Sequence, residues 1–361
     1  MDAAKEKKVK VKKSSKNSMK VEFEGQLSTW ERFKIKVLSL TFWKDILLKI
    51  CLYVFLIGIA YIVIYPFISK VSSSFMSADD FVDATVLYMP KNPTLDTYKA
   101  IITDNDYFTA LLNTFILSFS TAIIQMFITC LIGYGFAKFK FRGNGVLFLF
   151  VILTMIVPNE TLHLAMFMKF RYFDIGFEFG EGIKIGLFNL LGGGVFEWLD
   201  ILDFTSVQLT NTYWPFIILS VCGVGFKNGL YIFLFRQFFR GVPDELEESA
   251  YIDGAGTFKT FLRVIIPLST AMLVTVFVFA FSWQWTDNYY VNVFFTTSGP
   301  YTLKDIITVP SSLDTTYAGE NMYVAAIRNT CGILIMMPLV IMYAFLQKYL
   351  VQGIERSGIV G

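Results

Sequence analysis

Residues 107–137, YFTALLNTFILSFSTAIIQMFITCLIGYGFA, contain no charged side chain. A helix rises about 1.5 Å per residue, and about 20 apolar residues cross the hydrocarbon core of a bilayer. The stretch is therefore long enough to span a membrane, with room for tilt or for an interfacial lead-in. Because hydrocarbon does not tolerate unpaired backbone groups, the stretch is predicted to be a transmembrane helix.

The composition of the whole chain has the same character. Of 361 residues, 55% are hydrophobic and 17% are charged, whereas roughly a quarter of a soluble domain is charged. The mean hydropathy is +0.55. These values predict an all-α membrane protein with several spans. With 31 basic and 29 acidic residues the net charge is +2, which excludes a uniformly basic nucleic-acid binder.

Five further stretches have the apolar character of residues 107–137, so six transmembrane helices are predicted. These five are residues 50–68, 145–159, 214–235, 264–285 and 329–347. The third span in chain order is short and stops at Pro158. The fourth contains Lys227.

Basic residues hold loops on the cytoplasmic side of a membrane, so the lysine-rich start of the chain predicts a cytoplasmic N-terminus. The connections after the second and fourth spans are basic as well, with Lys138, Lys140, Arg142, Arg236, Arg240, Lys259 and Arg263. The other connections are acidic. Six spans with both termini in the cytoplasm agree with every connection.

The predicted organisation has three parts. Residues 1–45 form a basic cytoplasmic tail, residues 46–350 form the transmembrane domain, and residues 351–361 form a cytoplasmic C-terminal tail. The domain includes an enlarged outer loop, 171–211, and a cytoplasmic loop, 236–263. The outer loop is glycine-rich and too long for a tight turn, which leaves two interpretations: a lid or docking surface, and a surface loop without a function.

Residues 241–256, GVPDELEESAYIDGAG, contain the start and stop signals of a short helix outside the membrane. Pro243 suits the first turn, and the Asp244 side chain is expected to accept a free backbone N–H there. The glutamates that follow favour the positive end of the helix dipole. Gly254 and Gly256 are expected to end the helix.

One side of this predicted helix is apolar. Leu246 and Ala250 recur at a spacing of four, and Tyr251 and Ile252 lie near the same side. The helix can therefore present an apolar knob with acidic neighbours, which suits a groove on another protein.

The same loop resembles the EAA loop of ABC importer permeases. It reads Glu248-Ser249-Ala250, three residues, Gly254, nine residues, and then Val264-Ile265-Ile266-Pro267. Its departures from the usual EAA, x3, G, x9, I-x-L-P pattern, at Ser249, Val264 and Ile266, are conservative in size.

More of the chain is similar to the carbohydrate branch of that superfamily, the maltose-type inner-membrane permeases. The matching segments are residues 92–98, NPTLDTY; Asn113-Thr114; residues 133–143, GYGFAKFKFRG; residues 235–239, FRQFF; and residues 283–287, WQWTD. The resemblance extends from about residue 46 to the end. The N-terminal tail and much of the loop 171–211 fall outside it.

The resemblance implies the six-span, type I importer fold and a permease subunit of an ATP-driven importer in a bacterial or archaeal plasma membrane. The expected cargo is a sugar or oligosaccharide delivered by an extracellular solute-binding protein. The expected partners are a second, homologous permease and two ATPase subunits, which bind ATP and Mg²⁺. The expected ATPase-coupling residues are Glu245, Glu248, Ala250, Asp253, Gly254 and Pro267. An amphipathic loop without an ATPase partner is the alternative.

In that family the EAA-like helix docks in a cleft of the ATPase. By this resemblance Glu248 is expected to meet a basic residue and Gly254 to permit the turn. The end of the chain, residues 353–361, resembles the short glycine-ended tail of maltose-type permeases, which reaches toward the ATPase. A frayed tail is the alternative.

Lys227 is the ionisable residue inside a predicted span. Such a group costs about 2.5–3.5 kcal/mol on insertion scales and usually faces a cavity or a partner. It is predicted either to line the translocation path or to mark an offset or broken span, with Gly223, Gly225 and Gly229 at the break.

Sugars offer apolar ring faces and many hydroxyls, so a sugar path would use aromatic plates beside amides and carboxylates. Trp283, Trp285, Asp287 and Asn288 could supply them, and Asn113 lies on a polar face of the second span. The other interpretation is an interfacial aromatic belt or simple packing, with Asn113 used for helix contact.

The sequence contains no catalytic or metal-binding motif. His163 is the only histidine, which excludes His-rich metal sites and most His-dependent triads. No G-x-x-x-x-G-K-[ST] loop occurs, so this chain is not expected to bind a cofactor or to hydrolyse ATP itself. Alternatives are a permease for peptides or anions and an ion-coupled secondary transporter.

Overall fold

The computed structural model describes residues 30, 40–173, 176–178, 184–186, 208–296, 298–316 and 319–356. Most of the basic tail 1–45, most of the loop 171–211 and the end of the tail 351–361 lie outside the described residues. The predictions made for those parts therefore stay predictions. The chain divides into two units, residues 1–69 and 70–361, which are described separately.

The first unit contains most of α2, Leu40–Ser73. Its segment Ile46–Ser73 is apolar and long enough to cross a membrane. Most of its side chains are apolar, as expected of a helix that lies in a bilayer. The span predicted at residues 50–68 is confirmed as an apolar helix.

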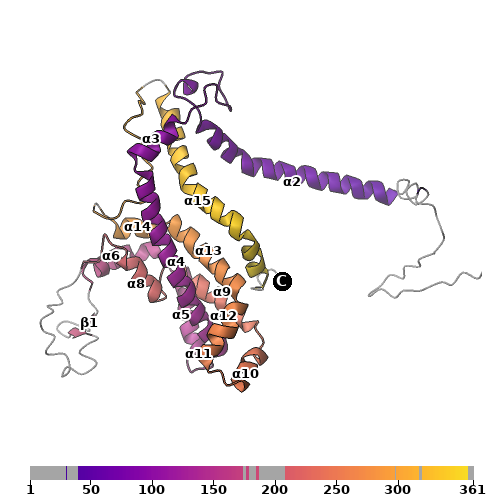
Figure 1. Ribbon diagram of the computed structural model, residues 1–361, viewed down its shortest axis with the longest axis vertical. Coiled ribbons are helices and arrows are strands. Elements are labelled where there is room, and N and C mark those ends of the chain that lie inside the picture. Colours follow the sequence, from indigo (N-terminus) through magenta and orange to yellow (C-terminus); the bar gives the residue numbers. More distant parts are fainter. Residues whose placement is uncertain are drawn as a thin grey trace, which may run out of the picture. The chain divides into compact units, whose positions relative to one another are not determined.

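The second unit is a bundle built around α4, Tyr107–Lys138. Helices α9, Asn228–Arg240, and α13, Thr270–Trp285, pack against α4, and α15, Glu320–Arg356, packs against α13 (Figure 1). The short α3, Asp96–Asp104, contacts α15. α4 and the segment Glu320–Gly353 of α15 are long and apolar enough to span a membrane, as predicted.

Glycines let these helices approach closely. A Cβ built on Gly133 of α4 would lie 2.5 Å from Cβ of Phe235 on α9. A Cβ on Gly353 of α15 would lie 2.0 Å from Oγ1 of Thr275 on α13. Atoms of the neighbouring helix therefore occupy the space that a larger residue would need at both positions.

Two predicted spans differ from single long helices. The third corresponds to α5, Asn144–Ile156, which has only 13 residues. The fourth is divided into α8, Trp214–Val221, and α9, with Gly223 at φ +73° and Lys227 at φ +63° between them. Right-handed helices need negative φ, so the chain cannot continue as one helix here. The broken span foreseen around Lys227 is observed, and a role of Lys227 in a translocation path stays a prediction.

The fifth predicted span is bent. The predicted residues 264–285 belong to a longer segment made of α11, Thr257–Thr260; a π-helical turn η4, Phe261–Ile265; α12, Ile266–Leu268; and α13. The segments Thr257–Leu268 and Thr270–Trp285 meet at 78°. In the described residues, three helices are long and apolar enough to cross a membrane, or four if the bent pair counts as one span. Helix length alone therefore does not establish six spans.

The remaining elements are short. They are η1, Asp79–Phe81; η2, Asn159–Leu162; α6, His163–Arg171; α14, Tyr289–Phe294; and the antiparallel pair β1, Gly176–Glu178, and β2, Lys184–Gly186. α14 packs against α6. The strand pair is a departure from the all-α prediction, and it lies within the predicted outer loop.

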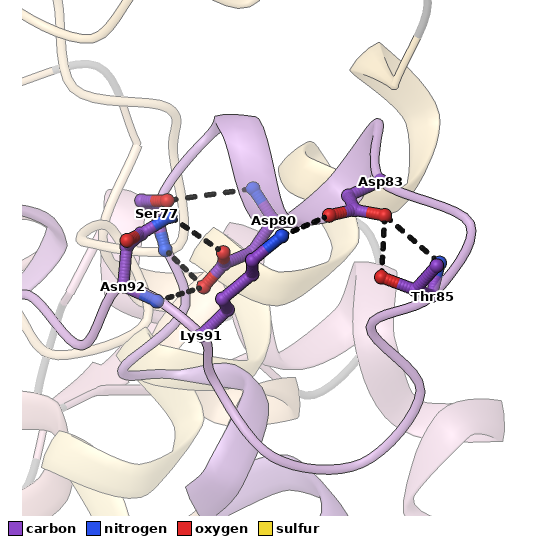
Figure 2. A network of polar contacts seen from close by, with 6 residues as sticks. All are labelled: Ser77, Asp80, Asp83, Thr85, Lys91 and Asn92. Carbon is purple, nitrogen blue, oxygen red and sulfur yellow. Dashed lines mark hydrogen bonds and ion pairs between the residues drawn. The ribbon is translucent and has the colours of Figure 1, made fainter.

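The connection between α2 and α3 is held by a carboxylate that is almost fully buried (Figure 2). Asp80 accepts hydrogen bonds from the backbone N–H of Asn92 at 3.2 Å and from its Nδ2 at 3.2 Å. Beside it, Lys91 Nζ lies 2.9 Å from Asp83 Oδ2. The hydrogen bonds to Asp83, chiefly from Thr85 and Lys91, hold the pKa of that carboxyl well below its usual range. The acidic residues of this connection thus order a loop of the protein itself.

The close approach of α4 and α9 gives a testable prediction. Gly133→Ala should lower the free energy of unfolding by about 1–3 kcal/mol, because the new methyl overlaps Phe235. Gly135→Ala is the matched control two residues along the same helix, since nothing lies within 4 Å of a Cβ there. Thermal unfolding of both variants in detergent is the measurement, and equal midpoints would contradict this packing.

Candidate functional site

The polar helix α10, Glu245–Ile252, lies at the end of the bundle where α4 ends (Figure 1). Its start differs from the prediction, because the Asp244 side chain caps no backbone N–H of the helix. The Asp244 carboxylate instead lies 2.5 Å from Lys138 Nζ at the end of α4. The Asp244 side chain, which was expected to cap the start of α10, therefore joins α10 to α4.

Tyr134, Lys138, Asp244 and Glu247 form one group, here called the Lys138 cluster. Lys138 Nζ also donates to the carbonyl of Val242 at 2.6 Å and lies 3.4 Å from Glu247 Oε1. The Tyr134 hydroxyl donates to Glu247 Oε2 at 3.0 Å. Glu247 is buried, with 7% of its surface exposed. Breaking a buried ion pair leaves an uncompensated charge, so the cluster fixes α10 to α4.

Lys138 also sets the ionisation of its exposed partner. Its hydrogen bond and its positive charge hold the pKa of Asp244 below the usual value. A lowered carboxyl pKa means that the pair forms above the unfolded pKa and is lost as the pH falls through the folded pKa. The attachment is therefore complete at neutral pH.

The other end of α10 has the predicted stop. Gly254 adopts φ +78°, and its N–H donates to the carbonyl of Tyr251 at 3.0 Å. The N–H of Ala255 donates to the carbonyl of Ala250 at 2.9 Å. This pair of bonds is the Schellman motif, which requires the left-handed conformation that glycine adopts without strain.

The side of α10 away from the Lys138 cluster is open. Glu245, Glu248 and Asp253 are exposed, and Ala250 is half-buried. Beside these acidic groups lie exposed apolar side chains, namely Leu246, Ile252, Phe258 and Leu262. Tyr251 is also exposed, on the helix face that carries Glu247. Ile252 is 86% exposed, an unusual position for a large aliphatic residue. The predicted combination of apolar knob and acidic neighbours is therefore present on one helix.

A short path of packed residues joins α10 to α13. The ring of Phe261 in η4 lies 4.8 Å from that of Tyr134, and Ile265 is fully buried. Pro267 follows in α12, immediately before the 78° bend that opens α13. Tyr134 thus contacts both the helix and the segment that follows it.

Two of the six candidate path residues come together at the α8–α9 break. Lys227 Nζ lies 4.9 Å from the centroid of the Trp283 ring and 5.1 Å from that of Phe226. Lys227 and Asn228 line a cavity of about 740 Å³ between α5, the break and Tyr290 of α14. Its walls are otherwise mainly apolar, and it is referred to below as the α5–α9 cavity.

The other four candidate path residues, Asn113, Trp285, Asp287 and Asn288, do not line the α5–α9 cavity. Trp285 is buried and donates from Nε1 to the carbonyl of Ile335 at 3.0 Å, which is the packing role foreseen as the alternative. With Asp287 and Asn288 it lines a separate cavity of about 160 Å³. Asn113 donates from Nδ2 to the carbonyl of Tyr301 at 2.9 Å.

Asp287 is also engaged within the protein. Its Oδ1 accepts the backbone N–H groups of Tyr289 at 3.0 Å and Tyr290 at 3.1 Å. The amide of Gln284 lies 3.3 Å from its other oxygen. Asp287 therefore organises the start of α14.

Sequence reasoning missed Glu247 and the roles of Tyr134 and Lys138. It assigned the glutamates of α10 to the helix dipole and Lys138 to membrane orientation. The available signal was the spacing of three between Asp244 and Glu247, which places both carboxylates on one helix face. Among the described residues, no group of three or more His, Cys, Asp or Glu side chains could hold a metal.

Apolar helices that can span a membrane indicate an integral membrane protein, and the polar helix α10 is fixed to the end of one of them. Residues 127–356, more than half of the chain, match the model of one family. The chain belongs to the binding-protein-dependent transport system inner membrane components. This confirms the resemblance to ABC importer permeases and the location in a bacterial inner membrane.

Individual relatives agree with this family. The maltodextrin transport system permease protein MalD of Streptococcus pneumoniae is 27% identical over 85% of this chain and 93% of that protein. A chain of a bacterial ABC transporter involved in import of the acidic polysaccharide alginate has the same fold, with a TM-score of 0.62 and 20% identity over 85% of this chain and 97% of that one. A chain of the alginate transporter in complex with an alginate-bound periplasmic protein gives a TM-score of 0.54 at 15% identity, covering 84% and 95%.

Adjacent glutamates of α10 provide the test of the Lys138 cluster. Glu247→Gln should weaken the attachment of α10 by up to about 3 kcal/mol, because the buried Lys138 loses one of its two carboxylates. Hydrogen exchange of the α10 amides should become faster. Glu248→Gln is the matched control, since its side chain is exposed and should leave the exchange unchanged. Equal protection in both variants would contradict the cluster's role.

Proposed function

We propose that this chain is the translocation subunit of an ATP-driven importer for a sugar or oligosaccharide. In this proposal an extracellular solute-binding protein delivers the cargo, and a second homologous permease completes the pathway. Two separate ATPase subunits, with ATP and Mg²⁺, supply the energy. The chain itself moves the solute and performs no catalysis.

The observation that carries the proposal is the two-sided character of α10. One side is fixed to α4 by the buried Glu247, and the other offers Glu248 beside exposed apolar residues such as Leu246 and Ile252. An amphipathic helix of this kind binds in a groove of a partner, with its apolar side chains as anchors. The proposed partner is the ATPase, with Glu248 opposite a basic residue of its cleft.

The attachments of α10 explain how motion would pass into the membrane. The Lys138 cluster joins α10 to α4, and η4 and α12 join it to α13. A displacement of α10 by the ATPase would therefore move two helices of the bundle together. This is the rigid-body rocking that alternating access needs.

The proposed topology keeps six spans with both termini in the cytoplasm. α5, the pair α8 and α9, and the bent segment from α11 to α13 supply the third, fourth and fifth. Interrupted helices are tolerated at membrane depth where the irregular backbone is buried in protein or lines a cavity. The α8–α9 break meets that condition, because Gly225 is buried and also lines the α5–α9 cavity.

The carbohydrate part of the proposal is supported by the relatives, whose names refer to maltodextrin and alginate. A permease for another kind of solute is the nearest rival. An ion-coupled transporter is the more distant rival, and it would need no ATPase. Uptake into vesicles with and without ATP separates the last possibility from the proposal.

Two glycines of the loop test the coupling. Gly254→Ala should reduce ATP-driven uptake at least about tenfold, because alanine at φ +78° costs about 1–2 kcal/mol and distorts the end of α10. Gly256→Ala is the matched control, since Gly256 has φ −74° and open space around it. Both variants should still insert into the membrane. Normal uptake and ATPase assembly in both Gly254→Ala and Glu248→Ala would overturn the proposed coupling.

A further inference from the structure

The bend before α13 is made at a single residue, Ser269. The segments Thr257–Leu268 and Thr270–Trp285 meet there at 78°. Ser269 has φ −90° and ψ 11°, and this ψ lies outside the range of an α-helix. Its own carbonyl accepts the N–H of Leu273 at 2.9 Å, which begins the bonding of α13. One residue therefore ends the first segment and starts the second.

The bend lies within the fifth predicted span, where backbone carbonyls need donors from the protein itself. Where a helix changes direction, the carbonyls of its last turn lose their regular partners, and hydrocarbon offers none. Pro267 adds to the deficit, because proline has no N–H to donate to the preceding turn. The residues at the bend must therefore supply the donors.

The hydroxyl of Ser269 is one of these donors. Its Oγ donates to the carbonyl of Ile265 at 2.7 Å and lies 3.1 Å from that of Ile266. The backbone N–H of Ser269 meets the same two carbonyls, at 3.0 and 3.1 Å. The Thr270 hydroxyl donates to the carbonyl of Pro267 at 2.7 Å. Serine and threonine side chains that bond to carbonyls of the preceding turn often bend helices, and here they satisfy three consecutive carbonyls before the bend.

Burial makes these bonds hard to exchange. Ser269 and Ile265 are both fully buried, so water cannot replace the hydroxyl if the bend opens. A buried acceptor that loses its donor costs more free energy than the hydrogen bond contributes when it is made. The geometry is therefore that of a fixed corner rather than of a loose hinge.

We propose that Ser269 is a positioning residue for energy coupling, because its hydroxyl holds the angle between α13 and the segment that follows α10. That segment contacts α10 through α11 and η4, so the bend lies on the covalent path from α10 to α13. With the angle fixed, a displacement of α10 turns α13; with the angle free, the bend absorbs the displacement. The inference rests on the proposed function for the source of the displacement, whereas the fixed angle is a property of the chain alone.

The angle can be measured through the distance between spin labels on the two segments, in the full-length chain in lipid nanodiscs. The labels are attached at Lys259→Cys and Thr286→Cys, both exposed positions, in a chain whose four native cysteines are replaced by alanine. With Ser269 present, the distance distribution should be single and narrow. Ser269→Ala should widen it, because losing a hydrogen bond of ordinary strength raises the population of other angles roughly two- to tenfold.

Two variants separate the hydroxyl from the packing around it. Ser269→Thr keeps the donor, so the narrow distribution should remain. Ser118→Ala is the matched control, since Ser118 is equally buried in α4 but its hydroxyl has no hydrogen-bond partner in the part of the chain that the structure describes.

The functional readout is the amount of maltotriose taken up per ATP hydrolysed by the assembled importer. This ratio should fall about threefold in Ser269→Ala, in line with the loss of one hydrogen bond, and stay unchanged in Ser269→Thr and Ser118→Ala. If Ser269→Ala fails to assemble, Ser269→Cys takes its place, because a thiol is a weaker donor and should lower the ratio less.

Several results would overturn the inference. An unchanged distribution or an unchanged uptake ratio in Ser269→Ala would do so, and a broad distribution with Ser269 present would show a loose hinge. Equal widening in Ser269→Thr and Ser269→Ala would assign the angle to packing instead of the hydroxyl. Maltotriose uptake that does not depend on ATP would refute the proposed function, whereas the spin-label distances test the fixed angle without any ATPase.

Discussion

The burial of one ammonium group, that of Lys138, determines how the polar end of this protein is built. A buried cation is tolerated only when carboxylates and carbonyl oxygens replace its water. The Lys138 ammonium contacts the carboxylates of Asp244 and Glu247 and the carbonyl of Val242. The Tyr134 hydroxyl donates a hydrogen bond to the second carboxylate oxygen of Glu247. These contacts join the end of α4, the start of α10 and, through the rings of Tyr134 and Phe261, the π-helical turn. The three elements are therefore joined by direct side-chain contacts.

The helix interruptions follow from a second constraint, which is that backbone groups at membrane depth need partners. At the α8–α9 break, a Cβ on Gly225 would lie 2.9 Å from the amide of Gln125 on α4. The same amide lies 3.3 Å from Ser220 Oγ of α8. α4 thus supports the interruption from one side, and the α5–α9 cavity lies on the other. A continuous helix here would remove the position from which Lys227 reaches Trp283.

The sequence predicted the features that depend on local composition. Long uncharged runs identified α2, α4 and α15, and Gly254 marked the end of α10. The bend before α13 escaped prediction because residues 261–285 stay apolar on both sides of it apart from Arg263, so hydropathy does not change there. Glu247 escaped because its partner Tyr134 lies 113 residues away in the sequence, and only the folded bundle brings them together.

Glu247 and Glu248 show why the proposed coupling role needs two different carboxylates. Neighbouring residues of a helix point about 100° apart, so one can face α4 while the other faces solvent. A loop with only the exposed group could bind a partner, but it would move without carrying α4 and α13 with it. A loop with only the buried group would be firmly attached, yet it would offer a partner nothing acidic beside Leu246 and Ile252. In the proposed importer, force reaches the membrane because α10 has both.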